Sequence, residues 1–218
     1  MANGSIVVGG TGLIGSEVLK LLAADPAFTP VTALARRSFD APAGIQVKVT
    51  DFSEKLESET PASEYYFCCI GTTIKKAGSQ EAFRKVDYDL VINSARAAFA
   101  KGARIALVVS ALGSDKNSSI FYNRVKGDME EALQQIGFRT VYVFRPSLLT
   151  GDRAEMRPGE KVGQAIGFLA GPLFLGPMKR YKPIAGKTVA AAMVRLAKAQ
   201  GTGVHFIESE MIAKVASA

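Results

Sequence analysis

A glycine-rich turn near the N-terminus restricts the fold of this chain more than any other part of its sequence. The apolar run over residues 5–9 ends in GGTGLIG, which satisfies GxGxxG at Gly10, Gly12 and Gly15 and GxxGxxG at Gly9, Gly12 and Gly15. Glycine permits a tight turn, lets a ligand approach the backbone, and lets the following helix pack closely on the strand. The pattern therefore predicts a strand, a turn and the start of a helix.

The start of that helix is a predicted binding site for phosphate. Free amide groups near Leu13 and Ile14, together with the positive end of the helix dipole, would face the ligand, and Thr11 lies in the same turn. We interpret the turn as a dinucleotide site because it follows the first strand and opens a helix. The alternative is an ordinary glycine-rich turn without a ligand.

Short apolar runs alternate with helical patterns along the first two-thirds of the chain. Strand-like runs cover residues 5–9, 31–36, 45–50, 65–70, 103–110 and 139–144, and helix-like segments cover 13–24, 79–102 and 118–137. The runs are apolar almost throughout, as in a parallel sheet covered by helices on both faces. We therefore predict an α/β fold with a Rossmann-type doubly wound parallel sheet. The 218 residues would form one domain, to which residues 151–218 contribute a small substrate or lid region.

Charge and cysteine content bear on partners and compartment. The net charge is +7, but the basic residues are scattered, which favours a small anionic ligand over nucleic acid. Cys68 and Cys69 are neighbours in an apolar run, as expected of reduced, buried strand residues. No secretion signal precedes the first strand, so we predict a cytoplasmic protein without a transmembrane segment. Formation of a homo-oligomer is left open.

The end of the second strand bears on the choice of dinucleotide. A NAD site has a carboxylate about 20 residues after the glycines, whereas this chain has Arg36 and Arg37 in that region. A guanidinium group forms paired hydrogen bonds with a 2′-phosphate, so the arginines favour NADP(H); alternatively, they only solvate the strand end. Asp51, after the third strand, would either accept a hydrogen bond from the adenine amino group or cap a helix that SEKLE begins.

The sequence YNRVK provides a candidate acid–base pair. Tyr122 and Lys126 are four residues apart, so they lie on one face of a helix. A nearby ammonium group favours the phenolate and lowers the pKa of a tyrosine, which suits proton exchange near neutral pH. The motif stands in the helix after the fifth strand, beyond Ser110, where parallel sheets have their ligand crevice.

Taken together, these motifs resemble the short-chain dehydrogenase/reductase superfamily in its atypical, NADP-type branch. The resemblance rests on GGTGLIG, ARR, FCCIGTT followed by KAG, FRKVDYDLVINSA, VVSALGSDKNSS, FYNRVKGDMEE and FRPSLLTGDRAEMRPGE, in this order over residues 5 to about 165. The resemblance implies an oxidoreductase that uses NADP(H) and a small-molecule substrate.

The resemblance also implies a role for each matching residue. Pyrophosphate contacts would come from Gly9, Thr11, Gly12, Leu13, Ile14 and Gly15, 2′-phosphate contacts from Arg36 and Arg37, and adenine contacts from Asp51 and Phe52. Ile70, Gly71 and Thr72 would line the ribose and nicotinamide, and Pro146 and Ser147 would close the nicotinamide side. Tyr122 would be the catalytic acid/base, and Lys126 would bind the ribose beside it.

Two polar positions depart from the superfamily pattern or are ambiguous. Its reductases usually hold the substrate oxygen with a serine or threonine just past the fifth strand, whereas here Ser110 is followed by Ala111 and Leu112. Ser110 is the candidate catalytic hydroxyl, although it could point into the sheet, and Ser114 could lie too far out. Asn93 stands where the superfamily often has an asparagine, and a buried amide satisfied by backbone groups would explain it equally well.

The C-terminal third is less informative. Residues 162–178 carry no charge but are too short and too interrupted by proline for a transmembrane helix. They fit a buried helix and loop, an apolar wall over a substrate pocket, or an interfacial or oligomer surface. His205 lies in a predicted late strand, where we expect a structural role, and we predict no metal site.

Three functions are compatible with these features. The first is a reductase in which NADPH supplies hydride, Tyr122 supplies a proton, and Lys126 keeps the phenol acidic. The second is a non-catalytic NADPH-sensing regulatory or interaction protein, suggested by the serine position and the short substrate lobe. The third, an epimerase or dehydratase of nucleotide sugars, fits less well because such members of the superfamily usually carry a larger C-terminal domain.

Overall fold

Seven strands form one parallel sheet. The computed structural model describes residues 4–53, 55–151, 181–199 and 201–218. The strands are β1 (Ser5–Val8), β2 (Val31–Ala35), β3 (Ile45–Val49), β4 (Tyr65–Cys68), β5 (Ile105–Val109), β6 (Thr140–Arg145) and β9 (Gly203–Glu208). Their order is β3-β2-β1-β4-β5-β6-β9, and each is parallel to its neighbours. This topology confirms the predicted Rossmann-type sheet.

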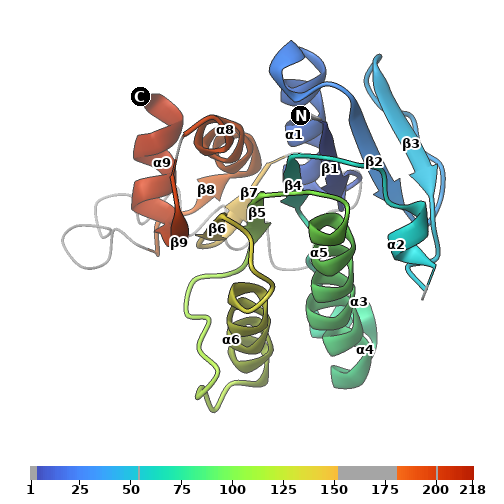
Figure 1. Ribbon diagram of the computed structural model, residues 1–218. Helices are drawn as coiled ribbons and strands as arrows, with labels where there is room; N and C mark the ends of the chain where they lie inside the picture. The colour runs from blue at the N-terminus through green and yellow to red at the C-terminus, as the bar shows by residue number, and fades with distance from the viewer. Residues whose placement is uncertain (1–3, 54, 152–180, 200) are drawn as a thin grey trace.

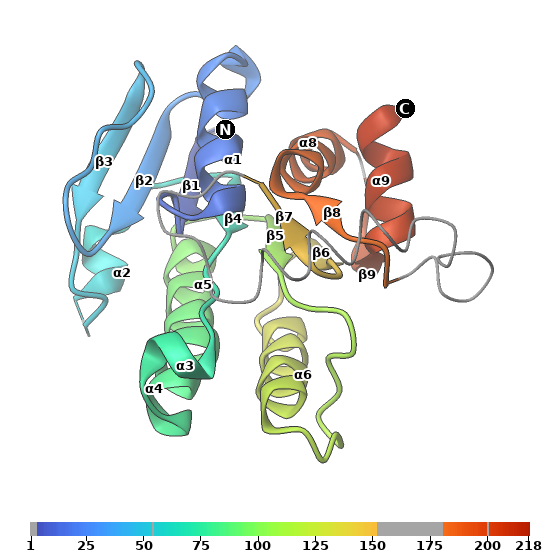
Figure 2. The same ribbon diagram turned by 180° about the vertical axis from the view of Figure 1, so that it is seen from behind.

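Helices cover both faces of the sheet. The longer ones are α1 (Leu13–Ala23), α5 (Leu90–Ala100), α6 (Phe121–Gln134), α8 (Gly186–Ala197) and α9 (Ser209–Ser217). Short helical segments are η1 (Pro26–Phe28), α2 (Leu56–Glu59), α3 (Ile74–Ala77), α4 (Gln80–Arg84) and η2 (Lys85–Asp89). Figures 1 and 2 show α1, α8 and α9 on one side of the sheet and α5 and α6 on the other. The fold is therefore a three-layer α/β/α sandwich.

The strand sequences explain why both faces are covered. Val7 and Phe67 point into the core beneath α1 and α8, whereas Ile6, Val8 and Tyr66 point into the core beneath α5. Successive side chains of a strand alternate between faces, so a strand between two helical layers must be apolar throughout. β3 departs from this expectation, since its residues are half-buried or exposed at the edge of the sheet.

The helix predicted over residues 79–102 is interrupted. α4 ends at Arg84, η2 is a π-helical turn over Lys85–Asp89, and α5 continues from Leu90. A π turn adds a residue to the helical register without breaking the chain direction, and such turns are frequent at functional sites. Hydrophobic periodicity does not reveal this extra residue, so the prediction of one regular helix was wrong at this point.

Two of the motif glycines pack directly against other backbone atoms of the chain, so a side chain would not fit there. Gly9 has a φ of +84°, and a Cβ there would lie 2.6 Å from the carbonyl carbon of Cys69. A Cβ on Gly15 would lie 2.1 Å from the carbonyl oxygen of Gly9. Gly12 differs, because a Cβ there would meet only the Gly9 and Cys69 oxygens, at 3.3 and 3.9 Å. Gly9 and Gly15 are therefore required by packing, whereas Gly12 is exposed and a Cβ there would make a single tight contact.

The described C-terminal residues extend the same sheet. β9 pairs with β6, and a small second sheet joins β7 (Leu149–Thr150) to β8 (Ile184–Ala185). His205 stacks on the Tyr142 ring with centroids 5.1 Å apart, and its Nε2 lies 2.9 Å from the Thr202 carbonyl. Its contacts are those of a structural residue.

Part of the C-terminal prediction cannot be placed on this fold. The apolar segment 162–178 lies outside the described residues, as do residues 152–180 of the predicted substrate or lid region. Within the described ranges, none of the helices is long and apolar enough to cross a bilayer.

We predict that Gly15→Ala destabilises the protein, because its Cβ would collide with the Gly9 carbonyl oxygen and neither backbone can move without shifting α1 from β1. Overpacking against backbone should cost about 3 kcal/mol in the free energy of unfolding, which lowers Tm by roughly 10 °C. Gly12→Ala is the matched control, with an expected loss below about 1 kcal/mol. Equal losses of Tm in thermal unfolding would contradict this account of the loop.

Candidate functional site

The predicted site residues gather at the carboxyl edge of the sheet. The glycine turn follows β1, Arg36 follows β2, Ile70 follows β4 and Ser110 follows β5. β1 lies between β2 and β4 in the sheet. The strands that follow β1 in the chain are first added on one side of it and then on the other, so the strand order reverses at β1. Doubly wound sheets bind ligands at such a switch point, outside the carboxyl ends of the strands. The structure thus brings together segments that are far apart in the sequence.

The glycine turn presents a helix N-terminus to this edge. Gly12 is the N-cap of α1 and has no side-chain capping bond; its own amide donates to the Gly9 carbonyl at 3.0 Å. The first amides of a helix lack intrahelical acceptors. Thr11 and Gly12 are exposed, whereas Ile14 and Gly15 are buried. The turn can therefore offer amide groups, but not the Ile14 side chain, to a phosphate.

Leu13 connects the turn to the C-terminal helices. Added Cβ atoms at Gly151 and Gly186 would lie 2.8 and 2.6 Å from the side chain of Leu13. Leu13 therefore packs against Gly151, which follows β7, and against Gly186, the first residue of α8. The amide of Leu13 is a predicted phosphate contact, and the Leu13 side chain is held by packing against Gly151 and Gly186.

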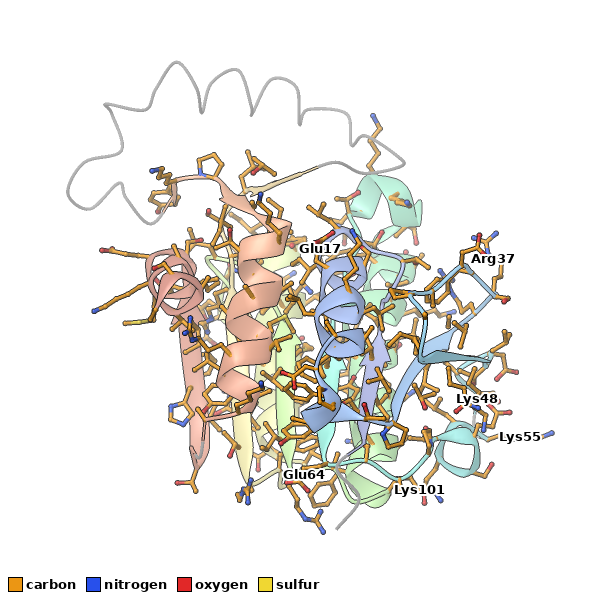
Figure 3. All side chains as sticks on the ribbon, turned by 90° about the horizontal axis from the view of Figure 1, so that it is seen from above. Glu17, Arg37, Lys48, Lys55, Glu64 and Lys101 are labelled. Atoms are coloured by element: carbon orange, nitrogen blue, oxygen red, sulfur yellow. The ribbon has the colours of Figure 1, made fainter. Side chains whose placement is uncertain are left out.

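The two arginines after β2 are exposed. Arg36 and Arg37 form no hydrogen bond or ion pair with any residue that the structure describes. In Figure 3, Arg37 projects outward at the same end of the sheet as Glu17 near the start of α1, while Glu64 and Lys101 lie at the opposite end. Both guanidinium groups are thus available to an anion at the carboxyl edge.

The segment after β3 has an unusual backbone. Phe52 has a backbone φ of 60°, which residues other than glycine rarely adopt. Its amide donates a hydrogen bond to Thr50 Oγ1 at 3.1 Å. Such conformations cluster at functional sites. Asp51 accepts a hydrogen bond from the Ser53 amide at 2.9 Å, and the hydroxyl and amide of Ser53 lower the pKa of its carboxyl group.

The alternative role of Asp51 as a helix cap is wrong. α2 begins only at Leu56, and its N-cap is Lys55. The Asp51 carboxylate closes a local turn with Ser53 instead, because aspartate side chains readily bond the backbone two residues on.

A buried carboxylate that the sequence analysis missed joins the predicted site. Asp87, in η2, has no exposed surface, and its Oδ2 accepts a hydrogen bond from the Thr72 amide at 2.9 Å. Its Oδ1 lies 2.7 Å from Lys126 Nζ, whose side chain is 2% exposed. Thr72 and Lys126, both predicted cofactor contacts, therefore meet at one carboxylate.

The charge of Lys126 depends on its neighbours. Burial disfavours the ammonium form, but the Asp87 carboxylate and, more weakly, the Tyr122 phenol outweigh it and raise the pKa of Lys126. Lys126 is therefore charged at neutral pH. The missed signal was periodicity, since Asp87 lies on the buried helical stripe between Phe83 and Val91.

Asn93 is exposed on α5. The alternative of a buried amide satisfied by backbone groups is therefore wrong, and the superfamily role of Asn93 stays a prediction. Asp87 instead supplies the buried polar group that α5 and its preceding turn present to α6.

Tyr122 lies one helical turn before Lys126. Its ring is half-buried and packs on Phe83 of α4 with centroids 5.2 Å apart. None of the described residues hydrogen-bonds its hydroxyl. The ring is thus fixed by aromatic packing, while the phenol oxygen is left for a ligand.

The serines after β5 are both buried. The hydroxyl oxygens of Ser110 and Ser114 are 3.0 Å apart, and Ser114 donates to the Ala111 carbonyl at 2.7 Å. A hydroxyl has one proton, so in this arrangement Ser110 donates to Ser114. Ser114 is therefore the direct hydrogen-bond partner of Ser110, and whether it reaches a substrate oxygen stays a prediction.

The loops after β5 and β6 contact each other. The Leu112 amide donates to the carbonyl of Pro146 at 3.0 Å, and the Ser147 amide donates to Ser209 Oγ at 2.6 Å. Pro146 is buried and Ser147 half-buried. These bonds hold the predicted nicotinamide side of the site to the loop after β5 and to the start of α9.

Other candidate sites are less well supported. A groove of about 450 Å³ beside α6 is lined mostly by polar and charged residues, among them Ser114 and Arg145, and contains neither Tyr122 nor Lys126. No group of three or more potential metal ligands occurs within the described ranges. Burial raises the pKa of the Cys68 and Cys69 thiols, which leaves both neutral and unreactive at pH 7.

Comparison with known proteins identifies the family. Residues 5–111 match the NAD dependent epimerase/dehydratase family. Protein FMP52, mitochondrial, of Candida albicans is 34% identical over 171 residues, or 75% of each chain. Protein HTATIP2 of Rattus norvegicus is 39% identical over 168 residues, or 73% of this chain and 69% of that protein.

The chain belongs to the atypical short-chain dehydrogenase/reductase superfamily. Two solved structures share its fold. Bordetella bronchiseptica WbmH in complex with NAD+ has a TM-score of 0.71, 14% identity, and coverage of 96% of this chain and 76% of that one. Human epimerase family protein SDR39U1 with NADPH has a TM-score of 0.63, 17% identity, and coverage of 93% and 73%. The chain is thus a member of an NAD(P)-binding family.

The prediction of a cytoplasmic location is contradicted by these relatives. The matching proteins of Candida albicans and Emericella nidulans are named as mitochondrial. The prediction rested on reduced cysteines and on the lack of a recognised secretion signal. Neither feature separates the cytoplasm from another reducing compartment, so the inference had no physical basis for that choice.

We predict that Tyr122→Phe leaves the stability unchanged within about 0.5 kcal/mol, because the ring packing on Phe83 is retained and the hydroxyl bonds none of the described residues. Phe83→Ala removes the fully buried partner ring and should cost about 3–5 kcal/mol. Urea unfolding of the two variants measures both values. A large loss for Tyr122→Phe would mean that the hydroxyl has a structural partner.

Proposed function

We propose that the protein is an NADP(H)-dependent oxidoreductase that moves hydride between the cofactor and the carbonyl or alcohol carbon of a small substrate. The observation that carries this proposal is the pairing on α6. A charged, buried Lys126 lies one turn from a Tyr122 whose hydroxyl bonds none of the described residues. A positioned phenol beside an ammonium group is suited to proton transfer.

The cofactor site is proposed along the carboxyl edge of the sheet. Its residues fit a dinucleotide, because the exposed Gly12 adjoins the free amides of α1 and two arginines without described partners follow β2. The proposed contacts are Gly9, Thr11, Gly12, Leu13, Ile14, Gly15, Arg36, Arg37, Asp51, Phe52, Ile70, Gly71, Thr72, Lys126, Pro146 and Ser147.

The preference for NADP(H) is a separate step of the proposal. The similar solved structures hold NAD+ in one case and NADPH in the other, so the fold alone does not distinguish the two. Arg36 and Arg37 favour the 2′-phosphate because they are exposed, cationic and free of described partners. A carboxylate in this position would repel that phosphate.

The chain's own residues would carry out the proton transfer. Bound NADPH would supply hydride to the carbonyl carbon of the substrate. As the carbonyl oxygen gains electrons, Tyr122 would donate its phenolic proton to it, and Lys126 would stabilise the resulting phenolate. Ser110 would bind the same oxygen after its hydroxyl turns away from Ser114. In the reverse direction Tyr122 would accept the alcohol proton.

The domain organisation remains part of the proposal. One domain over residues 1–218 would carry the site, with residues 151–218 shaping the substrate side. β9 lends support because it adds the outer strand of the sheet, and α8 does so because its first residue packs against Leu13.

A second candidate is a NADPH-binding regulatory or interaction protein without turnover. The observation that favours it is the hydrogen bond between Ser110 and Ser114, which occupies the hydroxyl that would otherwise bind a substrate oxygen. Tight NADPH binding without turnover in a broad screen of carbonyl compounds would support this candidate.

We predict that NADPH binds at least about tenfold more tightly than NADH, a difference of about 1.4 kcal/mol. The Arg36→Ala, Arg37→Ala double variant should lose most of this preference while NADH affinity stays the same, because only the 2′-phosphate loses its partners. Fluorescence titration with both cofactors measures the four affinities. Lys48→Ala, which removes a charge from β3, is the control and should keep the preference. Equal affinities of the wild type for the two cofactors would overturn the NADP assignment.

We predict that Tyr122→Phe lowers turnover about 100- to 10,000-fold on any carbonyl substrate found by NADPH absorbance, because it removes the proposed proton donor. NADPH affinity should stay within about twofold, since the amides of α1 and Lys126 remain. Turnover that survives the substitution would rule out Tyr122 as the acid while leaving the cofactor site intact.

A further inference from the structure

We infer that Asp87 is a positioning residue of the proposed site: it keeps Lys126 charged and holds it beside the loop that follows β4. This inference rests on the proposed function, because Asp87 would act only through Lys126 and Thr72. It assigns a task to the carboxylate that the superfamily resemblance did not include.

The contacts of Asp87 join two separate parts of the proposed cofactor site. One carboxylate oxygen lies 2.7 Å from Lys126 Nζ on α6, and the other accepts the Thr72 amide proton at 2.9 Å. Asp87 is fully buried and Lys126 is 2% exposed, so water does not compete for these contacts. A shift of α6 relative to the β4 loop would therefore break at least one of the two bonds.

The helix before α5 places two matched contacts on α6. Phe83 and Asp87 are four residues apart, as are Tyr122 and Lys126, and Phe83 packs on Tyr122 while Asp87 pairs with Lys126. Asp87 lies in the π turn that follows Phe83. The same helical segment thus fixes the ring of the proposed acid and the charge of its neighbour.

A second ion pair secures this helix contact. Arg84 Nη1 lies 2.8 Å from Asp128 Oδ2, and the Arg84 guanidinium lies 4.3 Å from the centre of the Tyr88 ring. Both partners are partly exposed, so this pair contributes modestly. The buried pair of Asp87 and Lys126 is the one whose charges are not screened by solvent.

Stability alone does not account for the buried pair. Removing two charges from water is costly, and replacing a buried ion pair by apolar side chains of similar volume is often neutral or stabilising. Breaking the pair by removing one partner is strongly unfavourable for the charge that remains. The arrangement therefore preserves a charged Lys126 at a place where the fold would otherwise exclude it.

The groups around Lys126 show why Asp87 is needed for that charge. They are Asp87 in η2, Tyr122 on α6 and Cys68 on β4. Burial raises the pKa of the Cys68 thiol, so it supplies no charge at neutral pH. The Tyr122 phenol is neutral when it acts as an acid. The compensating negative charge therefore comes from Asp87.

Asp87→Asn tests the inference with NADPH as the probe. The amide oxygen of asparagine can still accept the Thr72 proton, so the change removes the charge and keeps the shape. Without its partner, buried Lys126 should lose its proton several pH units below its ordinary value. The ratio of variant to wild-type Kd for NADPH should rise about tenfold between about pH 6.5 and 9.5 as that proton is lost. The ratio cancels titration of the cofactor itself.

Asp89→Asn is the matched control. Asp89 is exposed in the same π turn, so its substitution removes the same formal charge from the surface. Its Kd ratio should stay within about twofold at every pH. A pH-independent ratio for Asp87→Asn would overturn the inference, because a residue with only a structural role would not change the titration of Lys126.

Unfolding in urea tests the charge coupling without a cofactor. In the wild type, the raised pKa of Lys126 stabilises the fold below the unfolded-state value of about 10.4, and this contribution is lost at higher pH. In Asp87→Asn the folded-state pKa falls below that of the unfolded state, so protonation favours unfolding at neutral pH. The gap between the two midpoints should therefore narrow above about pH 10. A gap that does not vary with pH would contradict the coupling.

A double variant covers the case in which Asp87→Asn fails to fold. Asp87→Asn with Lys126→Gln leaves no uncompensated charge and should fold, whereas equally unfolded single and double variants would overturn the inference. If wild-type protein does not bind NADPH, the proposed function fails. If the wild-type protein binds NADPH and the Kd ratio of Asp87→Asn does not change with pH, only the proposed role of Asp87 fails.

Discussion

The contact between Gly15 and the Gly9 carbonyl sets the geometry on which the rest of the molecule depends. A Cβ at position 15 would lie only 2.1 Å from the Gly9 carbonyl oxygen, so only glycine lets α1 begin directly above the end of β1. Gly9 in turn rests against the backbone of Cys69, which places the loop after β4 beside the turn. Leu13, the first residue of α1, packs against Gly186, the first residue of α8. The start of α1, the loop after β4 and the start of α8 thus all pack around the same turn.

The two sides of the candidate site use charge in opposite ways. Near β2 the positive groups are exposed and form no bonds with the described residues, so they are ready for an anion and respond to salt. On α6 the positive group is buried and paired with Asp87, so salt has little access to it. The first arrangement is suited to selecting a ligand, and the second to keeping one protonation state. This division follows from burial rather than from the type of residue.

The fold could be predicted from local patterns because the inner strands are apolar and are followed by a turn or a helix. The pair of Tyr122 and Lys126 could be placed on one helix face by spacing alone. Asp87 could not be assigned a partner in this way, because its bond to Lys126 joins residues on different helices. The alternative of a buried amide at Asn93 was wrong, because this side chain is exposed on α5. The hydrogen bond between Ser110 and Ser114 could not be predicted either, because it lies in a loop whose sequence has no hydrophobic periodicity.

The position of β9 has a consequence for how this protein reaches its folded state. Ser147 bonds Ser209 over 62 positions of sequence, and β6 gains its outer neighbour only when this distant segment returns. Until then β6 is an edge strand whose Val141 and Val143 are apolar and whose ladder groups are unpaired. Parallel pairings of long separation form slowly, and open apolar edges recruit other chains. The vulnerable stage of folding therefore lies at the end of the sheet opposite to β3, and aggregation of partly folded chains should begin there.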